Sequence, residues 1–232
     1  MPMDRLSSET QRLFGLPAGG AVGPDAAGGR RALVAAFRRA ADWPAIAALY
    51  GKIGELGLAQ PALSVDGVGG FQVWFSLADA VDAARGRDFL AELCRDALAA
   101  LPAGVVELQP EGVALPPYAL PDGERWSAFV DPALGSLFAA EPWLDFPPSA
   151  DQQAELLAGC ASLSAADFRQ VLAERAPAPP ASPPPAPAAA AAPQLAGPYA
   201  DAASFLLAVI NDPSVDLALR IEAARALLAH RP

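Results

Sequence analysis

The stretch that decides the fold runs from residue 61 to residue 77 and reads PALSVDGVGGFQVWFSL. Its first five residues are short and extended, DGVGG has the glycine density of a turn, and FQVWFSL alternates with a period of two. The Asp-Gly pair in the turn favours a β-hairpin. In the second strand, alternation places Phe71, Val73 and Phe75 on one side, and Gln72, Trp74 and Ser76 on the other.

Upstream of this hairpin the sequence predicts a strand and a helix. Residues 30–39, RRALVAAFRR, contain an apolar run of strand length. Residues 41–58 follow with apolar residues at helical spacing, with Asp42 as the expected N-cap and Pro44 in the first turn, where a missing N–H costs nothing. Gly57 is the expected end of this helix.

Downstream, residues 78–101 predict a second helix, residues 105–110 (VVELQP) a strand and residues 125–132 (RWSAFVDP) one extra strand. The buried stripe of the second helix is expected to be Phe89, Leu90, Leu93, Ala97 and Leu98. The order is β-α-β-β-α-β plus a strand, which predicts an α+β fold of the ferredoxin-like, split βαβ type: a mainly antiparallel sheet with two helices on one face. Right-handed crossovers would place the first strand beside the second strand of the hairpin.

The rest of the chain divides by composition. Residues 1–29 show little periodicity and read as a flexible N-terminal segment, so the α+β domain with a helical extension is expected over 30–175. Residues 176–198 are rich in proline and alanine and predict an extended linker, with docking to an aromatic groove as the alternative. Residues 199–232 predict two short helices that break at Asn211-Asp212-Pro213 and must pair with each other. In the second of them Leu217, Ile221, Ala224 and Leu228 share a face.

Composition and charge reduce the number of functional classes that fit this chain. The formal net charge of −10 opposes general binding of nucleic-acid phosphates, although a local basic groove would still permit it. Cys94 and Cys160 form no CxxC pair, and His230 is the single histidine, so we expect neither a metal site nor a cofactor.

No apolar run has the roughly 20 residues that span a bilayer, and the N-terminus lacks the pattern of a signal peptide. We therefore expect a cytoplasmic protein without a membrane partner. The dominance of Ala, Pro, Gly and Arg is typical of GC-rich bacterial coding.

Residues 31–131 resemble the archaeo-eukaryotic primase–polymerase (AEP) superfamily, a match over less than half of the chain. That family carries an acidic DxD on an early strand, a histidine after a glycine-rich turn, and a hydrophobic residue followed by Asp on a later strand. GGFQVWFSL at 69–77 is similar to the second motif, LQP at 108–110 to a Phe-Pro-x-Gln neighbourhood found in one branch, and FVD at 129–131 to the third motif.

The chemistry of the family is not preserved. Two-metal nucleotidyl transfer needs several carboxylates, yet the first strand contains none. Gln72 stands at the histidine position, where it cannot transfer a proton. The resemblance therefore implies a degenerate active site without catalysis, and candidate nucleotide- or nucleic-acid-binding residues Gly70, Gln72, Trp74, Arg125 and Asp131.

Each candidate also has a structural interpretation. The glycines can be turn glycines rather than a phosphate cradle. Gln72 can be a polar residue on the solvent side of a strand, and Trp74 and Trp126 can be strand aromatics rather than a base-stacking platform. Asp131 can simply end its strand, and Arg125 can be solvated at the surface.

Two functional hypotheses remain. The first is a non-catalytic primase-like domain with an accessory role on nucleic acid or nucleotide, linked to a mobile element. The second is an adaptor whose helical pair at 199–232 recruits a protein partner or self-associates. The sequence at 212–228 is similar to C-terminal segments of some phage small-terminase-like proteins, which suits an appendage of this kind.

Overall fold

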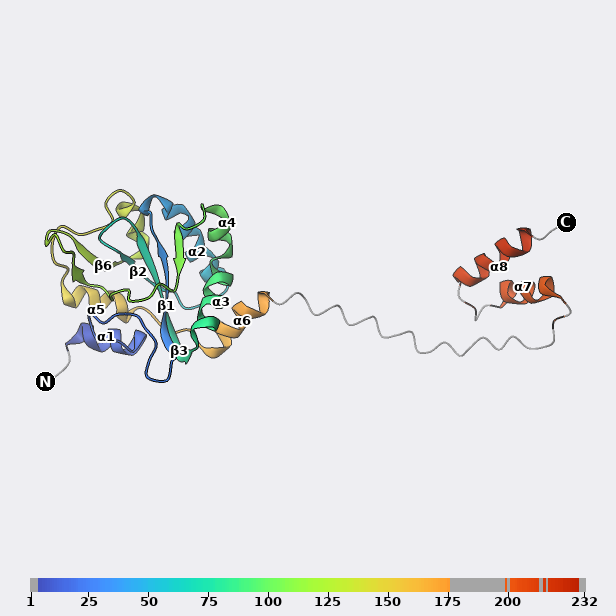
Figure 1. The fold of residues 1–232 in the computed structure, drawn as a ribbon, viewed down its shortest axis with the longest axis horizontal. Coiled ribbons are helices and arrows are strands. Elements are labelled where there is room, and N and C mark those ends of the chain that lie inside the picture. Colours follow the sequence, from blue (N-terminus) through green and yellow to red (C-terminus); the bar gives the residue numbers. More distant parts are fainter. Residues whose placement is uncertain (1–3, 176–198, 200, 213–214, 216, 230–232) are drawn as a thin grey trace. The chain divides into compact units, whose positions relative to one another are not determined.

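The computed structural model describes residues 4–175, 199, 201–212, 215 and 217–229 (Figure 1). The chain divides into two compact units, Met1–Ala176 and Pro177–Pro232, which we call the main unit and the C-terminal unit. The linker predicted over 176–198 lies outside the described residues.

The main unit is built on one six-stranded sheet in which every neighbouring pair is antiparallel. The strand order is β4-β1-β3-β2-β6-β5. β1 lies beside β3, as expected, with Ala35 opposite Val73. The expected hairpin is also present, with Val65 opposite Phe71. The strands are β1 (Arg30–Phe37), β2 (Ala62–Val65), β3 (Phe71–Val81), β4 (Val106–Leu108), β5 (Tyr118–Ala119) and β6 (Trp126–Val130).

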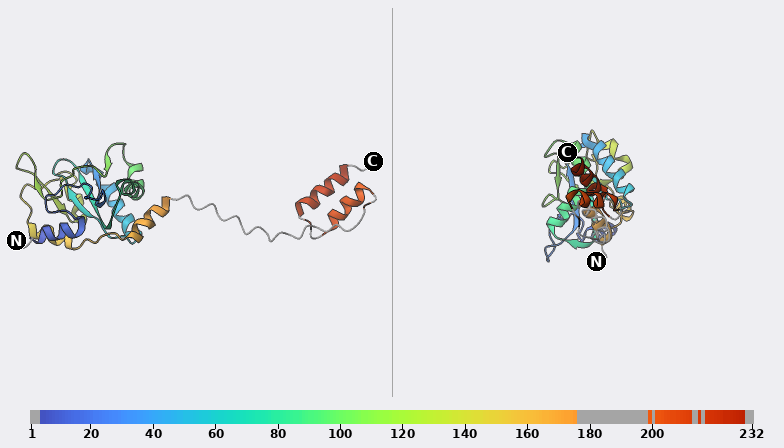
Figure 2. Two further views of the ribbon diagram at one scale, coloured as in Figure 1. Left: turned by 60° about the horizontal axis from the view of Figure 1, so that its bottom comes forward. Right: turned by 90° about the vertical axis from the view of Figure 1, so that its right-hand side faces the viewer.

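Helices cover both faces of this sheet. The first face carries α2 (Trp43–Glu55), α3 (Ala83–Leu93), α4 (Arg95–Ala100) and α6 (Ala165–Arg175), which share one apolar core with the sheet. On the second face α1 (Arg5–Phe14) and α5 (Ala150–Ala158) lie side by side and bury a smaller core (Figures 1 and 2). The sequence predicts helices on one face only, and this is wrong because α1 and α5 cover the second face.

The N-terminal segment is part of the fold, contrary to the expected flexible lead-in. Asp4 caps α1 by accepting a hydrogen bond from the backbone N–H of Ser7 at 2.7 Å. Leu13 and Phe14 are buried against Trp74, which faces α1 from β3. The sequence gives only a weak helical signal here, because the three buried apolar residues, Leu6, Leu13 and Phe14, are spread over a short polar helix.

The second predicted helix begins later and is broken. β3 continues to Val81, Asp82 then caps α3, and the chain restarts as α4 after Cys94. Phe89, Leu90, Leu93 and Ala97 are buried as predicted, while Leu98 is half-buried.

Asp42 does not cap α2 with its side chain. Its carboxylate instead accepts two hydrogen bonds from the guanidinium of Arg39, at 2.7 and 2.9 Å. A short 3-10 helix, η1 (Ala40–Asp42), replaces the expected direct entry into α2.

The described part of the C-terminal unit contains two helices, α7 (Ala202–Asn211) and α8 (Leu217–Ala229), which pack against each other. α7 ends at Asn211, as predicted. Val215 and Ala223 are buried here among the described side chains, whereas Ile221 and Leu228, on the predicted shared face, are exposed.

Candidate functional site

The backbone N–H groups of the glycine-rich hairpin turn donate hydrogen bonds to an aspartate of the same turn. Asp66 Oδ1 accepts hydrogen bonds from the backbone N–H groups of Val68, Gly69 and Gly70 at 2.8, 2.8 and 2.9 Å. Three converging amides are the donors that would hold a phosphate in a cradle. Because a carboxylate already accepts them, the geometry favours the turn interpretation of these glycines.

Glycine is required at Gly70 by close packing. A Cβ there would lie 1.9 Å from the carbonyl oxygen of Phe37, which belongs to the backbone of β1. The absence of a side chain at Gly70 therefore allows the turn to pack directly against the backbone at the end of β1.

Gln72 and Trp74 belong to a buried hydrogen-bond chain on the second face of the sheet. Trp74 Nε1 donates to Ser64 Oγ at 2.8 Å, and Ser64 Oγ donates to Gln72 Oε1 at 3.3 Å. Trp74 is fully buried and contacts Phe14 and Phe129, so it cannot serve as a base-stacking platform. Gln72 is only 8% exposed, so the interpretation of a solvent-facing polar residue is wrong as well.

The LQP segment is also structural. Gln109 is buried, with Oε1 accepting from Val34 N at 3.1 Å and Nε2 donating to the carbonyl of Ala32 at 3.2 Å. The side chain amide thus continues the ladder of β1 beyond the end of β4.

Arg125 and Asp131 lie at opposite ends of β6. Five strand residues separate them, so their α-carbons are about 20 Å apart at about 3.3 Å per residue. Arg125 donates to Asp122 at 2.6 Å, which lowers the pKa of that carboxyl, and its guanidinium lies 5.5 Å from the ring centre of Trp143. Asp131 caps the 3-10 helix η2 (Pro132–Phe138) by accepting from Ala133 N. The five predicted residues therefore do not converge on one site.

Trp126, the other proposed stacking residue, begins β6 and is half-buried. It exchanges backbone hydrogen bonds with Leu144 in the segment 142–149, which packs Leu144 against the core and leaves Phe146 78% exposed. Leu144 therefore covers part of the core beside β6, whereas Phe146 faces solvent.

Among the described residues there is no group of three or more His, Cys, Asp or Glu side chains that could hold a metal ion. Burial raises the pKa of the Cys94 thiol to about 12, and also raises the pKa of Cys160. Both thiols are therefore protonated near neutral pH, the weakly nucleophilic form.

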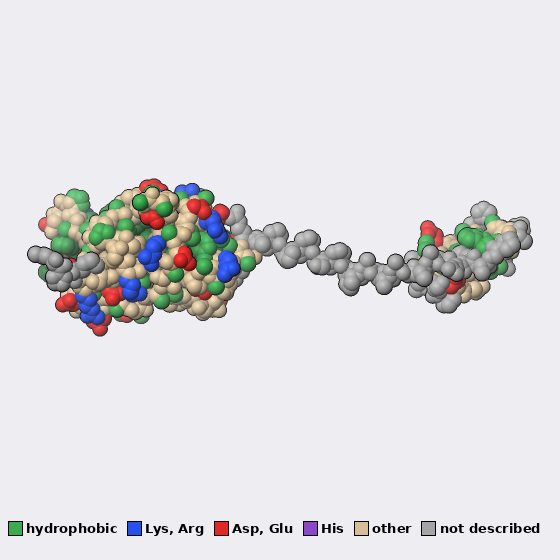
Figure 3. Space-filling model, turned by 90° about the horizontal axis from the view of Figure 1, so that it is seen from below, with side chains coloured by type: hydrophobic (Ala, Val, Ile, Leu, Met, Phe, Trp, Pro, Cys, Tyr) green, Lys and Arg blue, Asp and Glu red, His purple; other side chains and the backbone are tan. Residues whose placement is uncertain are grey.

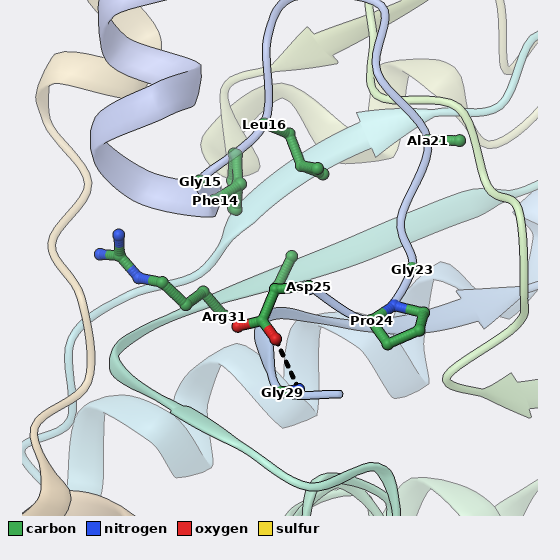
Figure 4. A pocket seen from close by; sticks show the side chains of 10 residues that line it. Phe14, Gly15, Leu16, Ala21, Gly23, Pro24, Asp25, Gly29 and Arg31 are labelled. Carbon is green, nitrogen blue, oxygen red and sulfur yellow. Dashed lines mark hydrogen bonds between the residues drawn. The ribbon is translucent and has the colours of Figure 1, made fainter. Parts of the chain in front are cut away.

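A small hollow of about 150 Å³ lies between the end of α1 and the loop 21–29 (Figure 4). Its one carboxylate, Asp25, accepts hydrogen bonds from Ala27 N and Gly29 N at 2.8 Å. The guanidinium of Arg31 points away from Asp25, and donates to the carbonyls of Leu77 and Arg12. The polar groups of this hollow are engaged within the fold.

The surface shown in Figure 3 carries basic and acidic side chains interspersed with apolar ones. On that face the described arginines and lysine do not gather into one continuous basic patch. That face therefore gives a phosphate backbone no continuous track of cations.

The surface features that sequence reasoning missed lie around α5. Two hollows of about 440 and 460 Å³ flank Asp131 and Glu155 there. The signal was available: residues 126–168 contain six acidic residues and no Lys, Arg or His.

The helices in the described part of the chain are all too short or too polar to cross a membrane. No protein-family model and no curated protein matches this sequence.

Proposed function

We propose that this chain is an adaptor whose C-terminal helical pair binds a second protein chain, either another copy or a different protein, with the main unit as its scaffold. The observation that carries the proposal is the exposure of large apolar side chains on α7 and α8. They are Phe205, Leu207, Leu219, Ile221 and Leu228, between 42% and 69% exposed.

The energetics of a two-helix unit support this proposal. Helices of 10 and 13 residues are marginal alone and depend on burying an apolar face. α7 has no charged residue from Ala202 to Asn211 and buries none of its side chains. A helix with so much uncovered apolar surface is typical of one that packs against another chain.

The charge of the region fits a protein partner. Residues 199–232 carry four acidic and three basic residues, against a net charge of −10 for the chain. A nearly neutral apolar surface gives no electrostatic advantage to nucleic acid and no strong repulsion to a second copy.

The test replaces Ile221 and Leu228 with Asp in the full chain and compares it with the control Ala203→Asp, an exposed position at the start of α7 where an acid suits the helix dipole. We expect the double variant to lose self-association in light scattering, or to lose specific partners in cross-linking pull-downs, while the control retains them. Equal masses and equal partners in all three proteins would refute the proposal.

A second proposal concerns the ancestry of the main unit. We infer that β1, α2, β2, β3, α3 with α4, and β4 form a ferredoxin-like, split βαβ core, because β3 lies between β1 and β2 and is antiparallel to both. This order supports an inactive relative of the primase–polymerase superfamily with an accessory role near nucleic acid. Binding of single-stranded and duplex DNA across a salt series tests that role. If neither form of DNA binds near physiological ionic strength, the nucleic-acid role is refuted.

A further inference from the structure

An apolar groove on the main unit runs beside α5. Its two hollows, of about 440 and 460 Å³, share five lining residues, and we call this surface the α5 groove. The shared residues are Phe129, Val130, Asp131, Glu155 and Leu156.

The floor of the α5 groove is rigidly fixed. Gln153 of α5 accepts a hydrogen bond from Phe129 N at 2.7 Å and donates to the carbonyl of Phe129 at 2.9 Å. This pair of bonds attaches the helix to the outer edge of β6, so the groove is preformed rather than opened by a ligand.

The rim of the groove is apolar on the side of η2. Leu134 lines one hollow and is 50% exposed. Leu137, which precedes the lining residue Phe138, and Phe146, which lies in the chain between the lining residues Leu144 and Pro148, are also largely exposed. Exposed apolar side chains beside a preformed groove are typical of a protein-binding surface.

The carboxylates of the groove have no compensating cation. None of the six acidic residues between 126 and 168 forms an ion pair with a described residue. Arg125 is paired with Asp122, and Arg12, which reaches the carbonyls of Leu157 and Cys160, is paired with Glu9. The field at the groove is therefore negative.

We propose that the α5 groove docks a cationic amphipathic helix of a partner protein. Apolar side chains spaced three and four residues apart would enter the two hollows, as in other helix-in-groove complexes. Lys and Arg beside them would meet Asp131 and Glu155, which increases the association rate and the specificity. This surface is distinct from the C-terminal helical pair, so either proposal can fail alone.

The experiment titrates the full chain with a labelled synthetic helix that has Leu on one face and Lys on the other. A twin with Glu in place of Lys, and a scrambled cationic peptide, are the matched probes. We expect micromolar binding of the cationic helix, at least about tenfold weaker binding of both controls, and weakening with added salt.

Variants locate the binding. Glu155→Lys reverses an exposed charge in the groove, Leu134→Ala removes an apolar wall, and Glu124→Lys makes the same charge change at the other end of β6. We expect the first two to weaken binding about tenfold and Glu124→Lys to change it less than about twofold. Equal effects of the two charge reversals, unchanged binding in Leu134→Ala, or no binding of the cationic helix would each overturn the proposal. Circular dichroism of each variant confirms that it is folded.

Discussion

The backbone of the hairpin turn leaves no room for a side chain at Gly70, whereas a Cβ at the neighbouring Gly69 would make only ordinary van der Waals contact. A Cβ at Gly70 would meet the carbonyl oxygen of Phe37 at 1.9 Å, and a Cβ at Gly69 would lie 3.6 Å from the carbonyl of Arg38. We predict that Gly70→Ala lowers the free energy of unfolding by more than about 2 kcal/mol, because backbone must move. Gly69→Ala should change it by less than about 1 kcal/mol. Urea denaturation measures both, and equal losses would contradict this account of the turn.

The buried chain of Trp74, Ser64 and Gln72 makes a second prediction. Ser64→Ala removes the acceptor of the buried indole N–H, so we expect a loss of about 1–3 kcal/mol in the free energy of unfolding. In a Trp74→Phe background the same change should cost clearly less, because no N–H is left without a partner. A double-mutant cycle by chemical denaturation gives the coupling, and additive losses would argue against the hydrogen bond.

The thiol of Cys94 provides a pH-dependent prediction. Burial raises its pKa from about 9 in the unfolded chain to about 12. The stabilisation from the neutral buried thiol is therefore complete below pH 9 and is lost as the pH rises from 9 towards 12. The unfolding free energy of the wild type, minus that of Cys94→Ala, should fall by about 1.4 kcal/mol per pH unit in that range. Denaturation at pH 8, 9 and 10 measures it, and a difference that is constant with pH would be the contrary result.

At the scale of elements, α1 is the part whose role most differs from expectation. Leu13 of α1 is fully buried against the second face of the sheet, whereas Gln11 of the same helix is exposed. We predict that Leu13→Ala lowers the free energy of unfolding by about 2–5 kcal/mol. Gln11→Ala should leave it within about 0.5 kcal/mol. If both variants were as stable as the wild type in thermal and urea unfolding, α1 would contribute little to the core.

α5 and α1 together cover the second face of the sheet. Gln153 bonds α5 to both backbone groups of Phe129, and Leu157 packs into the same small core as Leu13. The second face of the sheet, where Trp74 and Gln72 lie, is thus closed by segments about 140 residues apart in the chain. The residues of β3 alone therefore do not reveal that α1 and α5 bury this face.

At the scale of the whole molecule, the main unit and the C-terminal unit differ in how much apolar surface they bury. The main unit has a core on each face of its sheet, whereas five large apolar side chains are exposed among the described residues of the C-terminal unit. The main unit contributes the acidic α5 groove, and the C-terminal unit contributes an almost neutral apolar pair of helices. Two surfaces of different charge would select different partners, which is the property an adaptor needs.

The sequence by itself determined the elements that depend on local periodicity and turn chemistry. The hairpin at 62–81, the strand β1, the helix α2 and the end of α7 at Asn211 follow from alternation, helical spacing and a proline. The neighbouring positions of β1 and β3 also followed, because the connection rules leave few arrangements.

Only the tertiary structure decided what covers these elements. Gln72, Trp74 and Gln109 are polar or aromatic residues that suggest a site when read along the strand, yet distant segments bury them and engage their hydrogen-bonding groups. Conversely, the α5 groove combines β6, η2 and α5, and its negative field depends on which arginines are already paired. Burial and ion pairing are properties of residues brought together from far apart in the chain, and for that reason a local pattern does not specify them.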